Sequence, residues 1–212
     1  MPTIMTRVGY SSRPKGIAME RIVLVRHGET EWSRSGRHTG RTDVPLTDAG
    51  RAQAADLKPL LADWAFDVVL VSPLARARET FELLGRPEPA TVLDDLREWD
   101  YGDDEGRTTA EIRTERPGWS VWQEGPRHGE RIEEVAQRAD NALRSCTGDT
   151  LVVAHGHVLR VLAALWLGLD PHAGRLLALD PATVSVLDHE REQRVLREWN
   201  LRPRPAPGDD GR

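Results

Sequence analysis

Two short apolar runs constrain this chain most, because charged and imidazole side chains follow each of them directly. Residues 22–25 lead into Arg26 and His27, and residues 151–154 lead into His155. Near-continuous apolar runs of this length are typical of parallel strands that are buried on both faces. Parallel strands end at the same edge of a sheet, and open α/β sheets bind their ligands there. We therefore expect the two histidines to meet over one edge of one sheet.

Strand and helix patterns alternate along the rest of the chain, after a long polar loop that ends at Thr47. The expected strands cover 22–26, 67–72, 91–93 and 150–155, with an antiparallel edge pair at 183–187 and 194–199, and the expected helices cover 47–61, 73–85, 108–116, 130–146 and 158–168. Thr47 is a typical N-cap residue, and Pro73 is typical of a first helical position. The alternation predicts an α/β fold, a three-layer αβα sandwich with a mostly parallel central sheet.

The two ends of the chain differ in composition from its middle. Residues 1–18 lack an apolar stretch long enough for a signal peptide, so we expect a flexible leader. Residues 202–212 combine proline, glycine and charge, which predicts a disordered tail. The 183 residues from 19 to 201 are long enough for one domain with a full core. The candidate translation starts are Met1, Met5 and Met19.

Charge and cysteine content argue against several classes of function. The formal net charge of -5 arises from 34 acidic and 29 basic residues without a long basic run, which disfavours nucleic-acid and membrane-surface binding. The longest apolar stretch, 161–169, is well short of the ~20 residues that span a bilayer. Cys146 is the single cysteine, so the chain can form no internal disulfide, and we expect a reducing, cytoplasmic setting.

Arginine and histidine side chains gather at the expected strand ends. Arg26 ends the first strand and Arg76 lies in the first turn of the helix after the second, so both can bind phosphate oxygens through paired hydrogen bonds. A neutral His27 could attack phosphorus, and His155 could stabilise the transferring oxygens. A lone arginine is more often a surface ion pair and a lone histidine a structural residue, but the four together favour phosphoryl chemistry. A metal site is disfavoured because no acidic ligands accompany the histidines.

A proton donor for the leaving group is the remaining requirement. Glu98 lies between Leu96 and Trp99, whose bulk would partly desolvate the carboxyl and favour its proton-donating form. Asp100 and Glu105 are competing carboxylates nearby. An exposed loop glutamate is the alternative interpretation, so the residues alone leave the choice open.

Four motifs together resemble the histidine phosphatase superfamily, also called phosphoglycerate mutase-like. They are Arg-His-Gly-Glu-Thr at 26–30, Ser-Pro-Leu-Ala-Arg-Ala-Arg-Glu-Thr at 72–80, Glu-Trp-Asp-Tyr-Gly at 98–102 with Glu-Gly at 105–106, and Ala-His-Gly-His at 154–157. Each is short, but all four stand in the family's order, which makes the resemblance specific. It implies the same sandwich fold and no metal or organic cofactor.

The resemblance also implies a role for each matching residue. His27 matches the nucleophile that becomes phosphohistidine, and Arg26, Arg76 and His155 match the rest of the phosphate pocket. Glu98 matches the proton donor, which would then activate water to hydrolyse the phosphohistidine.

The superfamily includes mutases, phosphatases and non-catalytic members. Ser33, Thr39 and Gly40 fall where mutases place substrate contacts, but Ser33 stands in place of the usual asparagine. The chain between Glu98 and His155 is also shorter than in mutases and lacks their adjacent arginine pair. A mutase must keep water away from its phosphohistidine, and the shortened segment would do this poorly. Hydrolysis of small phosphate monoesters is therefore favoured. The alternatives are a primer-dependent phosphoglycerate mutase and a non-catalytic phosphate-binding module.

Longer stretches are similar to the acid phosphatase and sedoheptulose bisphosphatase branch of the family. This similarity implies that Arg160 contacts a second phosphate on a sugar, while the alternative is a solvated arginine on an apolar helix. Further candidate substrate contacts are Trp99, Tyr101 and His157. The expected partner is a small phosphorylated metabolite, with a homodimer left open.

Overall fold

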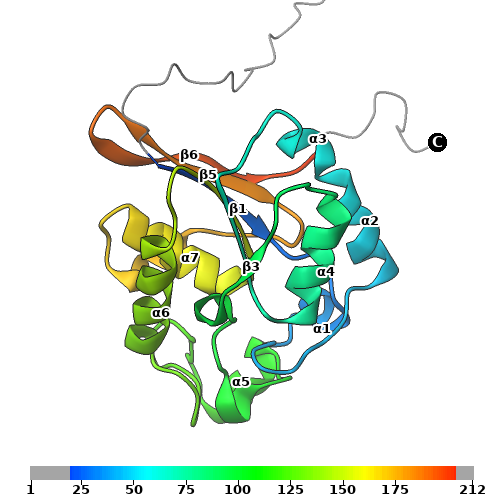
Figure 1. The fold of residues 1–212 in the computed structure, drawn as a ribbon. Helices are drawn as coiled ribbons and strands as arrows, with labels where there is room; N and C mark the ends of the chain where they lie inside the picture. Colours follow the sequence, from blue (N-terminus) through cyan, green and yellow to red (C-terminus); the bar gives the residue numbers. More distant parts are fainter. Residues whose placement is uncertain (1–19, 204–212) are drawn as a thin grey trace, which may run out of the picture.

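A single six-stranded sheet forms the centre of the computed structural model, which describes residues 20–203 (Figure 1). Its order is β3-β2-β4-β1-β5-β6. The strands are β1 (Arg21–Arg26), β2 (Val68–Val71), β3 (Thr91–Val92), β4 (Asp149–Ala154), β5 (Val184–Glu190) and β6 (Gln193–Leu201). The first four strands are parallel, whereas β5 runs antiparallel to β1 and β6 antiparallel to β5. The predicted mostly parallel sheet with an antiparallel edge pair is confirmed.

Helices cover both faces of this sheet. The α-helices are α1 (Glu31–Ser35), α2 (Asp48–Asp56), α3 (Lys58–Leu61), α4 (Ala75–Leu84), α5 (Thr109–Glu115), α6 (Ile132–Arg144) and α7 (Gly156–Trp166), and the 3-10 helices are η1 (Asp94–Leu96), η2 (Gly102–Asp104) and η3 (Pro171–Leu176). In β1, Ile22 and Leu24 pack in the core formed with α6 and α7, and Val23 and Val25 pack in the core formed with α3 and α4. Because successive strand residues point to opposite faces, a strand between two helical layers is apolar throughout. The three-layer α/β prediction is thus confirmed.

Several helix boundaries differ from the sequence predictions. Pro73 was expected at the first helical position, but α4 begins at Ala75 because Leu74 is extended and the Asp43 carboxylate accepts the Ala75 N–H at 2.9 Å. The single helix expected over 47–61 divides at Leu57, close to Pro59, which has no N–H for a continuing helix.

The polar loop expected before Thr47 contains the short helix α1. Thr30 caps it in a reciprocal arrangement with Ser33, in which the Ser33 N–H donates to Thr30 Oγ1 at 3.1 Å and the Thr30 N–H donates to Ser33 Oγ at 2.9 Å. A helix of five residues is too short for an apolar periodicity to be recognised in the sequence.

The predictions for the two chain ends fall largely outside the described residues. The expected leader, 1–18, is outside the described residues, as are 204–212 of the expected tail.

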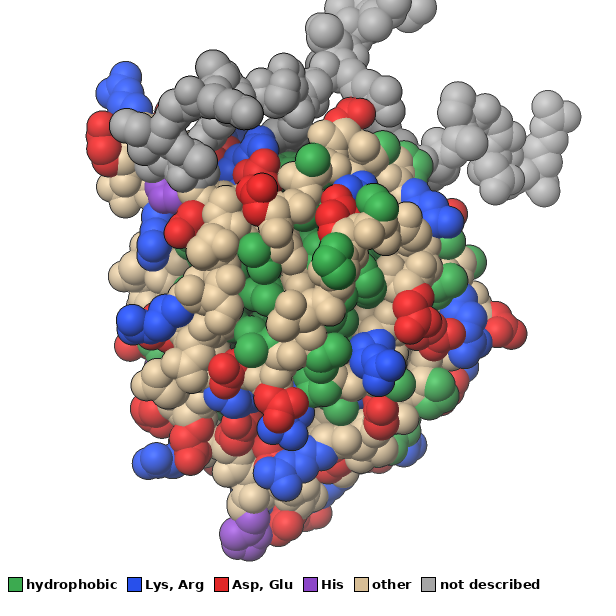
Figure 2. All heavy atoms as spheres, in the orientation of Figure 1, with side chains coloured by type: hydrophobic (Ala, Val, Ile, Leu, Met, Phe, Trp, Pro, Cys, Tyr) green, Lys and Arg blue, Asp and Glu red, His purple; other side chains and the backbone are tan. Residues whose placement is uncertain are grey.

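Across the described range of 20–203, no helix has the length and apolarity needed to span a bilayer. Acidic and basic side chains intermingle on the face drawn in Figure 2.

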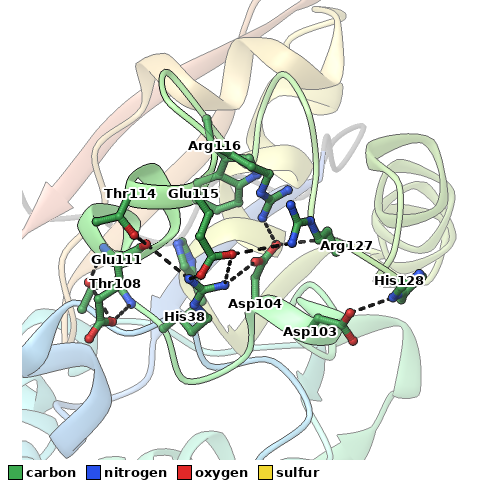
Figure 3. Close-up of polar contacts among 12 residues, drawn as sticks. His38, Asp103, Asp104, Thr108, Glu111, Thr114, Glu115, Arg116, Arg127 and His128 are labelled. Atoms are coloured by element: carbon green, nitrogen blue, oxygen red, sulfur yellow. Dashed lines mark hydrogen bonds and ion pairs between the residues drawn. The ribbon is translucent and has the colours of Figure 1, made fainter.

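A segment with little regular structure, residues 101–131, lies at one end of the sheet, with α5 apart from the two helical layers (Figure 1). We call it the cover segment. Its anchor is Asp104, whose side chain is fully buried. The Asp104 carboxylate accepts the Arg127 N–H at 3.0 Å and pairs with the Arg116 guanidinium, and Arg107 lies 3.7 Å away (Figure 3). One buried charge therefore joins three separate parts of the cover segment.

We predict that Asp104→Asn destabilises the protein by about 3 kcal/mol, because it leaves buried guanidinium charge without its anion. The free energy of unfolding from urea titrations measures this. The matched control is the neighbouring Asp103→Asn, since Asp103 pairs with His128 where both side chains are more than half exposed. The control should change stability by less than about 1 kcal/mol. Equal effects of the two variants would contradict the anchoring role of Asp104.

Candidate active site

The two strand-end histidines lie side by side. β1 and β4 pair in parallel with Arg26 opposite Ala154, so His27 and His155 follow at the same height. The His27 N–H donates to the Ala154 carbonyl at 3.0 Å, and the two imidazole centroids are 5.1 Å apart. The strand register therefore brings these distant parts of the sequence to one point.

One hydrogen bond sets the tautomer of His27. Its Nδ1 lies 2.7 Å from the Gly28 carbonyl, which can only accept, so Nδ1 carries the proton and Nε2 holds the free lone pair. The side chain is buried, with 5% exposed. This burial, followed by the nearby charges of Arg76 and Arg26, lowers the pKa of His27 well below its usual value. The imidazole is therefore neutral at physiological pH, as a nucleophile must be.

His155 is fixed through both of its ring nitrogens. Arg76 Nε donates to His155 Nδ1 at 3.1 Å, so the proton resides on Nε2, which donates to Ser72 Oγ at 2.7 Å. Burial, then the charge of Arg76, lowers the pKa of His155 well below its usual value. His155 is thus a neutral imidazole of defined tautomer next to His27.

Arg76 also supports the loop that approaches the site. Its Nη1 donates to the Thr42 carbonyl at 3.0 Å, and its Nη2 donates to the carbonyls of Thr39 and Gly40 at 3.1 and 3.2 Å. A Cβ on Gly40 would lie 2.4 Å from the Trp99 carbonyl oxygen, so only glycine fits there. Arg76 is completely buried, and this burial lowers its pKa from the ordinary arginine value.

Arg26 has fewer hydrogen bonds than Arg76. Its Nη1 donates to the Leu179 carbonyl, and its buried Nε has no hydrogen-bond partner. A Cβ on Gly156 would lie 3.2 Å from Arg26 Cζ, so the guanidinium packs closely against the start of α7. Donors remain on Arg26 for a bound anion.

The Glu98 carboxylate binds the start of α7. Its Oε2 accepts the His157 N–H at 2.9 Å, and its Oε1 accepts the N–H groups of Val158 at 2.9 Å and Trp99 at 3.0 Å. The first N–H groups of a helix have no partner within the helix, so a carboxylate is well placed there. Glu98 is buried, with 8% exposed.

A cavity of about 170 Å³ opens beside these groups. Its wall consists of Arg26, His27, Ser33, Gly36, Arg37, His38, Thr39, Glu98, Tyr101, Gly156, His157, Arg160 and Leu179. Glu98 is in this wall, whereas its competitors are not: Asp100 pairs with Arg41 at 2.7 Å, and Glu105 accepts two backbone N–H groups of residues 40–42 at 2.9 Å. Of the three carboxylates considered from the sequence, the structure brings only Glu98 to the cavity.

The predicted site residues fall into three groups. Arg76 and His155 are not in the wall; they are hydrogen-bonded to each other, and His155 lies beside His27. Gly40 and Trp99 are not in the wall either: Gly40 packs against the backbone, and the buried Trp99 donates its indole N–H to the Glu130 carbonyl at 2.8 Å. The other predicted residues line the cavity.

Among the lining residues, Ser33 and Thr39 have hydroxyls that donate to nearby carbonyls, those of Thr30 and Arg37 respectively. Arg160 donates to the Gly174 and Arg175 carbonyls at 3.0 and 3.2 Å. Its guanidinium lies 4.6 Å from the centroid of the Trp122 ring, a cation–π arrangement. It is therefore a held side chain rather than a freely solvated one.

The rings of Tyr101, His157 and His38 form an uncharged part of the wall. Tyr101 Oη and His157 Nδ1 are 2.7 Å apart, and burial raises the pKa of Tyr101 and lowers that of His157. The sequence interpretation missed His38, although it named the adjacent Thr39. His38 packs against Tyr101 at 4.7 Å between ring centroids, and burial lowers its pKa to about 4 despite the nearby Asp104 charge (Figure 3). Arg37 was also missed.

We predict that stability falls as the pH drops from about 6.5 toward 4, because buried histidines stay neutral in the folded state. An unfolded histidine takes up a proton near pH 6.5, so below that pH the unfolded state binds more protons than the folded state. Replacing His38 by glutamine should therefore reduce the loss of unfolding free energy between pH 7 and pH 5 by about 1 to 2 kcal/mol. Urea titrations at the two pH values measure this, and an identical loss in both proteins would contradict it.

Comparison with known proteins identifies the family. A model of the histidine phosphatase superfamily, branch 1, matches residues 22–202. The acid phosphatase of Mycobacterium tuberculosis is 39% identical over 200 residues, which cover 91% of this chain and 98% of that protein. The sedoheptulose 1,7-bisphosphatase of Saccharomyces cerevisiae is 36% identical over 185 residues, which cover 70% of this chain and 68% of that protein.

A solved structure has the same fold. It is that of an open reading frame product of Mycobacterium tuberculosis, with a TM-score of 0.82 and 39% sequence identity, covering 87% of this chain and 99% of that one. The resemblance of the four motifs is confirmed over residues 22–202. The chain belongs to the histidine phosphatase superfamily, in its branch 1.

Proposed function

We propose that this protein is a phosphatase that hydrolyses small phosphate monoesters through a phosphohistidine on His27. The observation that carries the proposal is the state of His27: a buried neutral imidazole whose protonated Nδ1 is held by the Gly28 carbonyl, in the wall of a cavity with Arg26 and Glu98. The family and its named phosphatase members support it.

The first half-reaction transfers the phosphoryl group to the enzyme. His27 Nε2 attacks phosphorus, the ester P–O bond breaks, and Glu98 gives its proton to the leaving oxygen. We assign Arg26, Arg76 and His155 to stabilising negative charge on the transferred group. Arg26 would do so from the cavity wall, and Arg76 and His155 from the hydrogen-bonded pair that they form outside it.

The second half-reaction returns the enzyme to its starting state. The ionised Glu98 takes a proton from water as its oxygen attacks phosphorus, the P–N bond breaks, and inorganic phosphate leaves. The three backbone N–H groups around Glu98 fit this ionised carboxylate. Because the first half-reaction needs the protonated carboxyl, we expect better turnover in mild acid. Acid also protonates His27, which limits this benefit, but burial lowers the pKa of His27 and so shifts its protonation to lower pH.

Sugar phosphates are the proposed substrate class, alongside broad acid phosphatase activity. Arg160, held by the Gly174 and Arg175 carbonyls, would contact a second phosphate where the substrate has one. We propose Ser33, Thr39, Tyr101 and His157 as further substrate contacts, since all four line the cavity. Gly40 and Trp99 would act through packing instead. The proposal includes a cytoplasmic setting without nucleic-acid binding, and it leaves a homodimer open.

We predict release of inorganic phosphate without any added bisphosphoglycerate primer. The assay offers an aryl phosphate, phosphoglycerates, fructose bisphosphate and sedoheptulose bisphosphate at acidic and neutral pH, each with and without primer. Ranking the released phosphate separates broad from sugar-selective activity. Primer-dependent interconversion of phosphoglycerates without release would instead support the mutase alternative, and binding without turnover would support the non-catalytic one.

We predict that Glu98→Gln slows alkyl phosphates at least tenfold more than an activated aryl phosphate, because only the poor leaving group needs a proton. Values of kcat/KM for one ester of each kind measure the difference. Asp100→Asn is the matched control, since Asp100 lies outside the cavity wall and should affect both esters alike. Equal losses on both esters in the Glu98 variant would assign the proton donor elsewhere.

A further inference from the structure

The loop between η3 and β5, residues 177–183, contacts both residues that begin the candidate site. The Leu179 carbonyl accepts a hydrogen bond from Arg26 Nη1, and the Ala182 N–H donates to the His27 carbonyl at 3.0 Å. Ala182 adopts a φ of 49°, in the left-handed region that residues other than glycine rarely enter. Such a conformation persists only where surrounding contacts impose it. The loop is therefore held in one shape directly against Arg26 and His27.

The direction of the Arg26 guanidinium depends on this loop. The guanidinium donates a hydrogen bond from Nη1 to the Leu179 carbonyl, whereas its Nε is buried without a hydrogen-bond partner. On the other side, the group packs against Gly156, where an added Cβ would lie 3.2 Å from Cζ. A shift of the Leu179 carbonyl would move the arginine relative to His27.

The residue after Leu179 is held by the last strand of the sheet. The Asp180 N–H donates to Asn200 Oδ1 at 2.8 Å, and Asn200 Nδ2 donates to Asp180 Oδ2 at 3.0 Å. The hydrogen bond from Asn200 is the main cause of the lowered pKa of Asp180. Arg202 also contacts Asp180 Oδ2 at 2.9 Å, but both of these side chains are about half exposed or more.

The backbone of β6 is shaped to present Asn200. Val184 pairs with Leu201 and Val186 with Glu198, so two β6 residues stand opposite one β5 residue. This is a β-bulge, a feature that redirects a side chain out of the strand alternation. Asn200 has a φ of 58°, which asparagine tolerates better than most residues, and its N–H donates to Ser185 Oγ at 3.0 Å.

We propose that the Asp180–Asn200 pair acts as a positioning device for the phosphate-binding Arg26, through the Leu179 carbonyl. Neither residue lines the cavity, and both lie far from the four family motifs in the sequence. The inference rests on the proposed function in one respect, that Arg26 binds the phosphoryl group. Displacement of a positioned group by about 1 Å can lower turnover by up to about a hundredfold.

The test is Asn200→Gly, which keeps the left-handed backbone accessible but removes both side-chain hydrogen bonds to Asp180. We expect the inhibition constant of inorganic phosphate to rise about tenfold, and kcat/KM for an aryl phosphate to fall by a similar factor. Arg202→Gln is the matched control: it removes only the exposed ion pair to Asp180 and should change either value less than about twofold.

A double variant tests rescue. In Asp180→Asn with Asn200→Asp, the asparagine amide at 180 can donate to the carboxylate at 200, so both hydrogen bonds can form again. This swap should restore phosphate inhibition to within about threefold of the wild type. If Asn200→Gly does not fold, Asp180→Ala provides the same two measurements.

The outcomes are distinguishable. Loss of thermal stability in Asn200→Gly with an unchanged phosphate inhibition constant would show a merely structural role and overturn the inference, as would failure of the swap to rescue a defective variant. Wild-type turnover is measured in the same assay. If the wild type releases no phosphate, the proposed function fails; if it does and Asn200→Gly behaves like the wild type, only the positioning role fails.

Discussion

The parallel pairing of β1 with β4 is the interaction on which the candidate site depends. The register places Arg26 opposite Ala154, so the chain leaves both strands at the same height and delivers His27 and His155 within 5.1 Å of each other. Both strands are buried between two helical layers, and a slip by one residue would move each of their side chains into the opposite core. Stability of the core and geometry of the site therefore share one cause.

Burial determines the protonation state of the groups gathered there. His27, His155 and His157 are neutral because desolvation, aided by nearby guanidinium groups, penalises their charged forms. The guanidinium groups stay cationic, so positive charge is concentrated on Arg26 and Arg76 while the imidazoles keep free lone pairs or defined N–H donors. This division suits phosphoryl transfer, which needs an uncharged nucleophile next to fixed positive charge. The same burial makes the folded state sensitive to acid.

The sequence predicted the layered fold because its strands are apolar on both faces and its motifs sit at their ends. It predicted less about short elements: α1 has five residues, and the start of α4 depends on a cap by Asp43, more than thirty positions earlier. The residues alone left the proton donor open among three carboxylates, and the family resemblance favoured Glu98, which is the one of the three in the cavity wall. Contacts such as that of Arg26 with the Leu179 carbonyl involve a backbone atom, which no side-chain pattern reveals.

The most direct test of the account is the position of the phosphoryl group during turnover. The wild type and His27→Ala are mixed with an aryl phosphate, denatured at alkaline pH to preserve phosphohistidine, and mapped by mass spectrometry. The account predicts one acid-labile phosphoryl group on His27 in the wild type, and neither phosphoenzyme nor turnover in the folded variant. Retained turnover in His27→Ala, or a phosphoryl group on another residue, would contradict it.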